Sequence, residues 1–313
     1  MSILPLFNPV RSLKRTMSVK PFRIQYISDI HLEMYDKQAF PLILKPNARY
    51  LALCGDIGYP REPIFKSFID YCSRHWDKVF YLPGNHEYYN DKPHYHWKYT
   101  TPDTMESIEN DIQTVLTPYR NVFYLNKGVH EFPEEEVNVV GATMWTHIPE
   151  DKYVSAEWGL NDFSQIACKI HAAPNYERFG PAKMSAIHKD HSAFILGALD
   201  AAAEQGRSAV VLTHHMPSLA LVAPRFVRDP NNYLFYTEMT EHLKHPALAA
   251  WICGHSHSAQ HVLFRPGVWL ALNCRGYPNE KVGGFSEWAC LELGDSATKR
   301  QASGYKEEEV ELM

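Results

Sequence analysis

The feature that most constrains this chain is the position of its polar residues relative to its predicted strands. Five short runs rich in β-branched and aromatic residues each end in a group of Asp, Asn or His residues. Ligands bind outside the carboxyl ends of the strands in α/β sheets, so we expect neighbouring strands to bring these groups into one site. The five groups are Ser28-Asp29-Ile30-His31, Gly55-Asp56, Gly84-Asn85-His86-Glu87, Thr213-His214-His215 and Gly254-His255-Ser256-His257.

Strand-like and helix-like segments alternate along the first part of the chain, whereas short strands follow one another near its end. This order is typical of an α/β domain with a mixed sheet, or with two sheets stacked between helices. The predicted strands are Phe22–Ser28, Tyr50–Cys54, Val79–Leu82, Val122–Leu125, Val137–Ala142, Ala209–Thr213, Leu248–Cys253, His261–Phe264 and Val268–Asn273. The predicted helices are Glu62–His75, Thr104–Leu116, Ala182–Glu204 and Tyr236–Lys244.

The chain contains no internal repeat and no Gly/Ser linker that would divide it, so we expect one domain over residues 21–294. Residues 1–20 are basic without an acidic residue and predict a flexible tail, with an organelle-targeting segment as the weaker alternative. Residues 295–313 are polar and predict a second tail. Residues 88–103 and 145–180 are aromatic but fit neither regular pattern, so we expect them to form the rim of a substrate site.

Charge and cysteine content exclude several kinds of protein. The 313 residues include 31 Lys and Arg against 36 Asp and Glu, a net charge of −5. This charge does not favour nucleic acid as a partner, because non-specific binding to phosphates needs an excess of positive charge. No apolar run approaches the roughly 18 residues of a membrane span, so no membrane partner is expected. The six cysteines form no Cys-x-x-Cys pair and predict a reducing, cytoplasmic location.

The residue types at the strand ends indicate a metal site. Carboxylate oxygen, amide oxygen and imidazole nitrogen, without thiolate, form a ligand set that suits manganese, iron or zinc. The groups provide enough ligands for two divalent or trivalent ions. Two such ions about 3.5–4 Å apart usually share a bridging carboxylate and can clamp both oxygens of a phosphoryl transfer. The pattern therefore predicts phosphoester chemistry at a dinuclear centre.

The five polar groups resemble, in the same order, the motifs of the calcineurin-like metallophosphoesterases. The motifs are Asp-x-His, Gly-Asp, Gly-Asn-His-Glu, Thr-His and Gly-His-x-His, and the resemblance covers about residues 22 to 275. The resemblance implies a four-layer α-β-β-α sandwich with two mixed sheets. It also implies that His86 assists the leaving group and that the other motif residues bind metal. The implied ligands are Asp29, His31 and His257 for one ion, Asn85, His214 and His255 for the other, and Asp56 as the bridge.

The chain departs from the Ser/Thr protein phosphatases of this superfamily at the second motif. The family pattern Gly-Asp-x-x-Asp-Arg-Gly is replaced by Gly-Asp-Ile-Gly-Tyr-Pro at positions 55–60, so that branch is not favoured. Tyr59 falls where purple acid phosphatases place an iron-binding tyrosinate. Those enzymes have glycine at the position of His31, and one position needs only one of the two ligands. We therefore favour His31 as the ligand and interpret Tyr59 as a packing or rim residue.

Several neighbouring residues keep open roles. His215 is an alternative to His214, and His147 and Arg275 could line the site or serve the fold. Glu87 is expected to brace its loop. The cysteines next to motif glycines, at positions 54 and 253, are expected to be small buried strand residues. The histidines predicted to lie on helix surfaces are His75, His171, His188, His191, His242 and His245.

The function that these patterns favour is hydrolysis of phosphate esters by a metal-bridging hydroxide. A phosphodiesterase or phosphatase acting on a small phosphorylated molecule fits the acidic net charge. The alternatives are a non-catalytic scaffold or binding protein with the same fold, and a metal-dependent nuclease. Scaffold members often lose a ligand, whereas no ligand is missing here; a nuclease would need a basic groove that the composition does not indicate.

Overall fold

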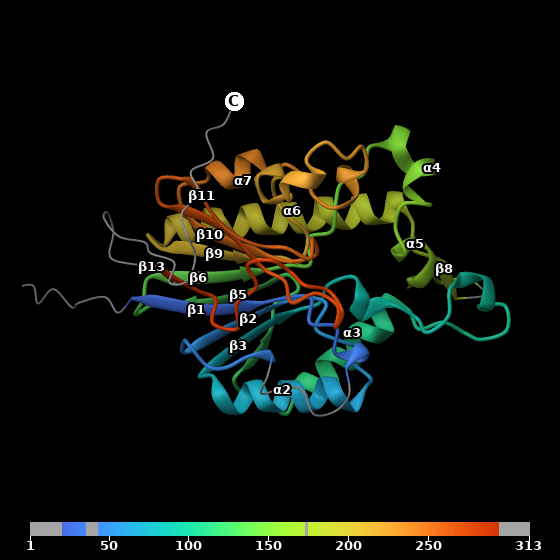
Figure 1. Cartoon of the computed structure of the whole chain (residues 1–313), viewed down its shortest axis with the longest axis horizontal. Coiled ribbons are helices and arrows are strands. Elements are labelled where there is room, and N and C mark those ends of the chain that lie inside the picture. The colour runs from blue at the N-terminus through green and yellow to red at the C-terminus, as the bar shows by residue number, and fades with distance from the viewer. Residues whose placement is uncertain (1–20, 36–42, 173–174, 294–313) are drawn as a thin grey trace, which may run out of the picture.

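Two mixed sheets packed face to face form the centre of the molecule, as the sequence predicts (Figure 1). The computed structural model describes residues 21–35, 43–172 and 175–293. The tails predicted at residues 1–20 and 295–313 lie outside these ranges. Within the described part of the chain, no helix has the length and apolar character that crossing a membrane requires.

The first sheet has the strand order β13-β1-β2-β3-β4, in which β1 to β4 are parallel and β13 is an antiparallel edge. Its strands are β1 (Phe22–Ile27), β2 (Tyr50–Cys54), β3 (Lys78–Leu82), β4 (Val122–Tyr124) and β13 (Cys290–Leu293). The second sheet has the order β11-β12-β10-β9-β6-β5, with antiparallel edges at β11 and β5. Its strands are β5 (Gly128–Phe132), β6 (Val137–Gly141), β9 (Ser208–Leu212), β10 (Leu248–Cys253), β11 (Ala259–Arg265) and β12 (Val268–Asn273).

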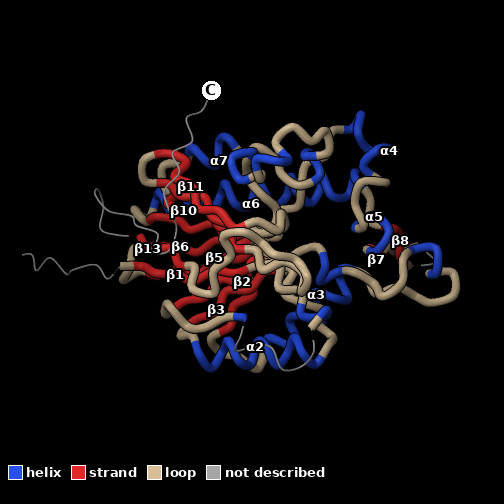
Figure 2. Tube along the Cα trace, viewed as in Figure 1, coloured by secondary structure: helices blue, strands red, loops and turns tan. Residues whose placement is uncertain are grey.

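Helices cover the outer face of each sheet (Figure 2). Helices α2 (Pro63–His75) and α3 (Met105–Leu116) lie on the first sheet. Helices α6 (Pro181–Glu204) and α7 (Thr240–Lys244) lie on the second. The short elements α4 (Tyr153–Ala156), α5 (Asp162–Gln165), β7 (Ala167–Lys169) and β8 (Tyr176–Arg178) occupy the segment for which no regular structure was predicted.

The alternation of side chains along the strands produces the four layers. In β2, Leu51 and Leu53 pack into the apolar cluster under α2 and α3, whereas Ala52 and Cys54 pack between the two sheets. A third cluster lies between the second sheet and α6. Each central strand is thus buried on both faces, which is why it reads as a continuous apolar run.

Helix α7 is shorter than predicted. The predicted helix Tyr236–Lys244 begins only at Thr240, because the preceding residues pair with another segment. Thr237 N–H donates to the carbonyl of Met216, and Met239 N–H donates to the carbonyl of Pro217. These backbone contacts fix the chain that follows the strand end of β9.

Three histidines predicted to lie on helix surfaces are buried instead. They are His188, His191 and His242. Met144 N–H donates to Nδ1 of His191, and Nδ1 of His188 contacts the carbonyl of Trp145 at 3.2 Å. Burial lowers the pKa of His188 and of His191 to about 4. The predicted surface position was wrong because His188 and His191 bond to backbone in the loop after β6, and Nε2 of His242 contacts the carbonyl of Ser192 in α6 at 2.9 Å.

We expect this burial to make stability fall in mild acid. The unfolded chain binds protons at these histidines below a pH of about 6.5, whereas the folded chain does so only near pH 4. The free energy of unfolding should therefore fall by about 2 kcal/mol per histidine between pH 7.5 and 5.0. Urea unfolding of the wild type and of His191→Gln measures this. A pH dependence unchanged in the variant would contradict the assignment.

Candidate active site

The polar groups at the five strand ends lie together, at the carboxyl ends of β1, β2 and β3 in one sheet and of β9 and β10 in the other (Figure 1). Two sets of motif side chains have ligand atoms within 4.8 Å of one another: Asp29, His31 and His257, and Asp56, His214 and His255. A third group, which shares His31 with the first set, consists of His31, Glu33 and His86. The strand ends therefore converge on one place, where two cations could bind.

The backbone at these strand ends adopts a conformation that most residues avoid. Five of the side chains belong to residues with positive φ: Asp29 (52°), His31 (53°), Asp56 (53°), His255 (72°) and His257 (45°). Non-glycine residues in this region carry strain, and such residues cluster at functional sites. Strain at five positions of one site indicates that the fold holds these side chains for a purpose other than stability.

Two motif glycines make room for the site. A Cβ atom at Gly84 would lie 2.2 Å from Oδ1 of Asp56 and 2.7 Å from Cε1 of His214. A Cβ atom at Gly254 would lie 2.7 Å from Oδ2 of Asp29. Glycine is therefore required at both positions because a side chain would displace the polar groups.

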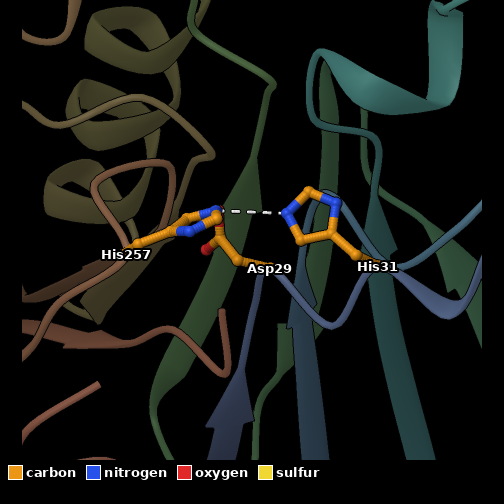
Figure 3. A group of neighbouring side chains, drawn as sticks. All are labelled: Asp29, His31 and His257. Atoms are coloured by element: carbon orange, nitrogen blue, oxygen red, sulfur yellow. Dashed lines mark hydrogen bonds and ion pairs between the residues drawn. The ribbon is translucent and has the colours of Figure 1, made fainter. Parts of the chain in front are cut away.

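The first set of side chains places two imidazoles edge to edge beside a carboxylate (Figure 3). Nε2 of His31 lies 3.1 Å from Nε2 of His257, and Nε2 of His257 lies 3.6 Å from Oδ1 of Asp29. Nδ1 of His31 donates to Glu33 at 3.1 Å, and Nδ1 of His257 donates to Glu280 at 2.5 Å. These donations leave both Nε2 lone pairs directed at each other, an arrangement that a cation would satisfy.

The second set repeats this pattern. Nδ1 of His214 donates to the carbonyl of Cys54 at 2.9 Å, so its Nε2 faces Oδ1 of Asn85 at 2.9 Å and Oδ1 of Asp56 at 3.5 Å. Nε2 of His255 is buried without a hydrogen-bond partner among the described residues. The oxygens of Asn85 and Asp56 thus face the imidazole nitrogen of His214, and Nε2 of His255 lies nearby without a partner.

Asp56, a member of the second set, also faces the first set. Its Oδ2 is 3.9 Å from Nε2 of His31, and its Oδ1 is 3.5 Å from Nε2 of His214. The backbone N–H of His86 donates to the same Oδ1 at 2.8 Å and helps to fix the carboxylate. One carboxylate thus faces both sets with a different oxygen.

The electrostatics match this convergence of acceptors. Burial alone would raise the pKa of Asp56, but nearby imidazoles, chiefly His214, hold it well below its usual value. Burial alone would lower the pKa of His214, and the carboxylate of Asp56 raises it to about 10. Burial, with a positive charge on His214, lowers the pKa of His255 to about 3. The site therefore favours positive charge between these groups, while His255 stays a neutral imidazole.

His86 lies beside the two sets of side chains and is a member of neither set. Its ring stacks on Tyr89 with centroids 4.2 Å apart, and its Nε2 lies 3.5 Å from the hydroxyl of Tyr277. Burial would lower the pKa of His86, but carboxylates, first Asp56 and then Glu33, raise it to about 9. A protonated imidazole is therefore stable at this position.

Glu87 braces the loop that carries Asn85 and His86, as expected. Its carboxylate accepts hydrogen bonds from the backbone N–H groups of Gly84, Asp56 and Ile57, at 2.7, 3.0 and 2.8 Å. Through these bonds the strand ends of β2 and β3 are tied to each other.

Three buried or half-buried carboxylates belong to the site and were missed by the sequence analysis. Glu33 and Glu280 orient the imidazoles of His31 and His257 as described above. The third is Asp162, whose Oδ1 accepts from Nδ2 of Asn85 at 2.8 Å and from the hydroxyl of Tyr89 at 2.6 Å. Only Glu33 had a local signal, because it follows the Asp-x-His motif by two residues.

A cavity of about 490 Å³ opens beside these groups. Its floor contains Asp56, Asn85, His86, His255 and His257. The segments expected at the rim contribute Tyr89 and the run from Trp158 to Asp162. The strand ends and the rim therefore enclose one space, in which a small molecule could reach the polar groups.

The residues with open roles are not among the described residues that line this cavity. His215 is buried, with its ring 4.2 Å from His255 and 5.2 Å from Trp145. His147 is exposed and lines a separate cavity beside α6. Arg275 lies over the rings of Tyr35 and Phe285. Tyr59 lines a neighbouring cavity, and burial raises the pKa of its hydroxyl. Cys54 and Cys253 are buried, as expected.

The family model for calcineurin-like phosphoesterases matches residues 22–259, and the chain belongs to this family. Because members of this family are metal-dependent enzymes, this chain is a metal-dependent phosphoesterase. The resemblance of the five motifs is thereby confirmed for the family, and the two mixed sheets are confirmed by the fold itself.

One protein is similar to this chain in sequence, and one solved structure is similar to it in fold. The uncharacterized protein L509 of Acanthamoeba polyphaga mimivirus is 27% identical over 287 residues, which cover 86% of this chain and 96% of the viral protein. The crystal structure of phosphopantetheinyl hydrolase (PptH) from Mycobacterium tuberculosis superposes with a TM-score of 0.57 at 18% identity, covering 82% of this chain and 89% of that chain. The second likeness is one of fold.

Proposed function

We propose that this chain hydrolyses small phosphate esters at a dinuclear metal centre. The observation that supports the proposal best is the position of Asp56, whose two carboxylate oxygens face different sets of ligand atoms. Asp29, His31 and His257 would hold one ion, and Asn85, His214 and His255 the other. The absence of the Asp-Arg pair after Asp56 supports a place outside the Ser/Thr protein phosphatase branch.

The donor set fits two ions of manganese, iron or zinc, because it combines imidazole, carboxylate and amide oxygen without thiolate. Such ions would supply Lewis acidity, which generates hydroxide near neutral pH and neutralises charge on the phosphoryl oxygens. The protein's own contribution is to hold the ligands. Glu33, Glu280 and the carbonyl of Cys54 fix the tautomer of three imidazoles, so that Nε2 faces the centre.

His86 would donate a proton to the leaving oxygen. Its ring lines the cavity floor, and Tyr89 on one face holds it in place. Its backbone N–H is bonded to Asp56, so its position is tied to the residue between the two ion sites. A group placed in this way can protonate an alcohol as the ester bond breaks.

Cavity size and charge support a small substrate rather than a polymer. The cavity of about 490 Å³ suits a small organic phosphate, and the net charge of −5 does not favour nucleic acid. All six cysteines are unpaired and buried, which supports a reducing compartment such as the cytoplasm.

Turnover by metal-free and reconstituted protein tests this function. We expect hydrolysis of phosphomonoesters or phosphodiesters after addition of Mn²⁺, and loss of that hydrolysis on chelation. No turnover of a broad ester panel by protein that holds two ions would contradict the proposal and favour a scaffold. Cleavage of DNA alone, with salt-sensitive binding, would instead favour a nuclease.

Asp162 gives a prediction about metal affinity. Asp162→Asn keeps the shape of the side chain but removes the charge that accepts from Asn85 and Tyr89. We expect roughly a 10–100-fold loss of metal affinity or activity, the usual effect of removing an outer-shell partner. Calorimetric titration with Mn²⁺ measures the affinity. Asp190→Asn, on the exposed surface of α6, is the control, and equal affinities would contradict a positioning role.

A further inference from the structure

The cavity beside the metal ligands is larger than the proposed reaction alone requires. A phosphate group against Asp56, Asn85 and the site histidines would fill only part of the roughly 490 Å³. Apolar side chains bound one part of the remaining space, and polar side chains such as Asn161, Arg225, Asp229 and Asn232 bound the rest. The apolar ones are Trp158, Leu160, Met216, Val222, Phe226 and Phe235. The cavity thus combines a polar floor with a wall that is partly apolar.

Two aromatic side chains of this wall remain open to solvent. Trp158 is 89% exposed and Phe226 is 43% exposed, although both line the cavity. A single exposed apolar residue has no special meaning on a protein surface. Two exposed aromatic side chains from distant segments, lining the cavity that holds the site, indicate a surface that a ligand covers.

Local packing fixes both segments. A Cβ atom at Gly159 would lie 2.5 Å from Cδ1 of Leu234, so the chain after Trp158 packs closely against a side chain of η7 (Asn232–Leu234). Nδ2 of Asn232 donates to the carbonyl of Phe226 at 2.6 Å. Both aromatic side chains therefore stand on backbone that is held in place, one joined to the other through η7.

The wall also reaches the metal ligands. The ring of Phe235 lies 5.4 Å from that of His255, at an interplanar angle of 34°. Met216 and Val222 are buried and line the cavity as well. An organic group attached to the phosphate would thus leave the polar floor and pass directly onto apolar surface.

We propose that the substrate of this site is a phosphoester whose organic group contains a flat apolar ring, which packs against Trp158 and Phe226. The inference rests on the proposed function, because the phosphate is taken to lie at the metal ligands. Burial of a ring that would otherwise face water favours binding roughly in proportion to the apolar area covered. Aromatic side chains add a preference for flat rings.

Two substrates with similar alkyl leaving groups test the proposal: propyl phosphate and 3-phenylpropyl phosphate. Because the ring is distant from the ester bond, the two differ little in intrinsic reactivity. We expect the wild type to have a kcat/KM about tenfold or more higher for the phenylpropyl ester. If the enzyme cleaves only diesters, the methyl diesters of the same alcohols replace them.

The variants Trp158→Ala and Phe226→Ala should each reduce this preference, and the double variant should bring the ratio of kcat/KM close to one. Poor folding lowers both rates together and leaves the ratio unchanged, so the ratio separates the two effects. Trp288→Ala is the matched control, because Trp288 is 44% exposed and does not line the cavity among the described residues. A wild-type ratio near one, or a ratio unchanged in the double variant, would overturn the proposal.

Binding of two phosphonates keeps this test separate from the test of the reaction. Propylphosphonate and 3-phenylpropylphosphonate carry no ester bond, and their dissociation constants are measured by calorimetry on the Mn²⁺-treated protein. We expect the phenyl compound to bind about tenfold more tightly, Trp158→Ala to reduce the difference, and the double variant of Trp158 and Phe226 to remove it. Equal binding would refute the ring preference. Preferential binding without any ester turnover would support it and refute only the proposed reaction.

Discussion

Replacement of Asp56 by Asn should lower kcat for phosphoester hydrolysis by at least about 10³-fold and reduce the bound ions below two per chain. Asp56 is the side chain whose oxygens face both ligand sets, so loss of its charge weakens both ion sites together. The amide oxygen of Asn can still accept from the N–H of His86, so the loop after β3 should stay in place. Steady-state kinetics and metal analysis on the same samples measure the two effects.

Asp151→Asn is the control for this variant, because Asp151 is an exposed carboxylate whose ion-pair partner is its neighbour Lys152. It should keep wild-type activity and metal content. An Asp56→Asn protein that binds two ions and retains more than a tenth of the wild-type kcat would show that Asp56 does not bridge the centre.

Replacement of His86 by Asn should lower kcat for alkyl phosphate esters by about 10²–10⁴-fold, the usual contribution of a general acid. The loss should be much smaller for a nitrophenyl ester, because nitrophenolate departs without protonation. Metal content should remain at the wild-type value, because His86 is not one of the proposed metal ligands. Measurement of kcat on both esters gives the comparison.

His147→Asn is the matched control for the His86 variant, because His147 lies at a separate cavity. An equal loss of kcat on alkyl and nitrophenyl esters would contradict proton donation by His86. Loss of a bound ion in the variant would instead identify His86 as a ligand.

The sequence predicted the central strands well because they are buried on both faces. Runs such as Tyr50–Cys54 and Leu248–Cys253 are apolar throughout, and each ends where the polar group begins. The edge strand β13 was missed because it has only four residues, one of them the exposed Glu292, and β5 was missed because exposed positions interrupt its pattern. In Gly128–Phe132, for example, buried and exposed positions mix over only five residues.

The carboxylates that orient the site could be predicted only in part. Glu33 lies two residues beyond His31, so motif spacing could have identified it. Asp162 lies 77 residues beyond Asn85, and only the packing of the segment around α5 against the loop after β3 brings them together. Such contacts depend on the tertiary fold, which local patterns do not encode.

The placement of aromatic residues shows the same limit. Residues 145–180 were expected at the substrate rim because they are aromatic and irregular. Trp158 does line the cavity, whereas Trp145 is fully buried in the apolar core. The composition of residues 145–180 indicated that the segment lies at the substrate rim. Only packing distinguishes a side chain that faces the cavity from one that supports the sheet.

The number of ions that the active enzyme binds tests the central claim most directly. Metal-free protein is titrated with Mn²⁺, and bound metal per chain is measured by mass spectrometry alongside the rate of phosphoester hydrolysis. We predict that activity reaches its maximum at two ions per chain, and that Asp56→Asn does not reach this state. Full activity with one bound ion, or two bound ions unaffected by loss of Asp56, would contradict the account.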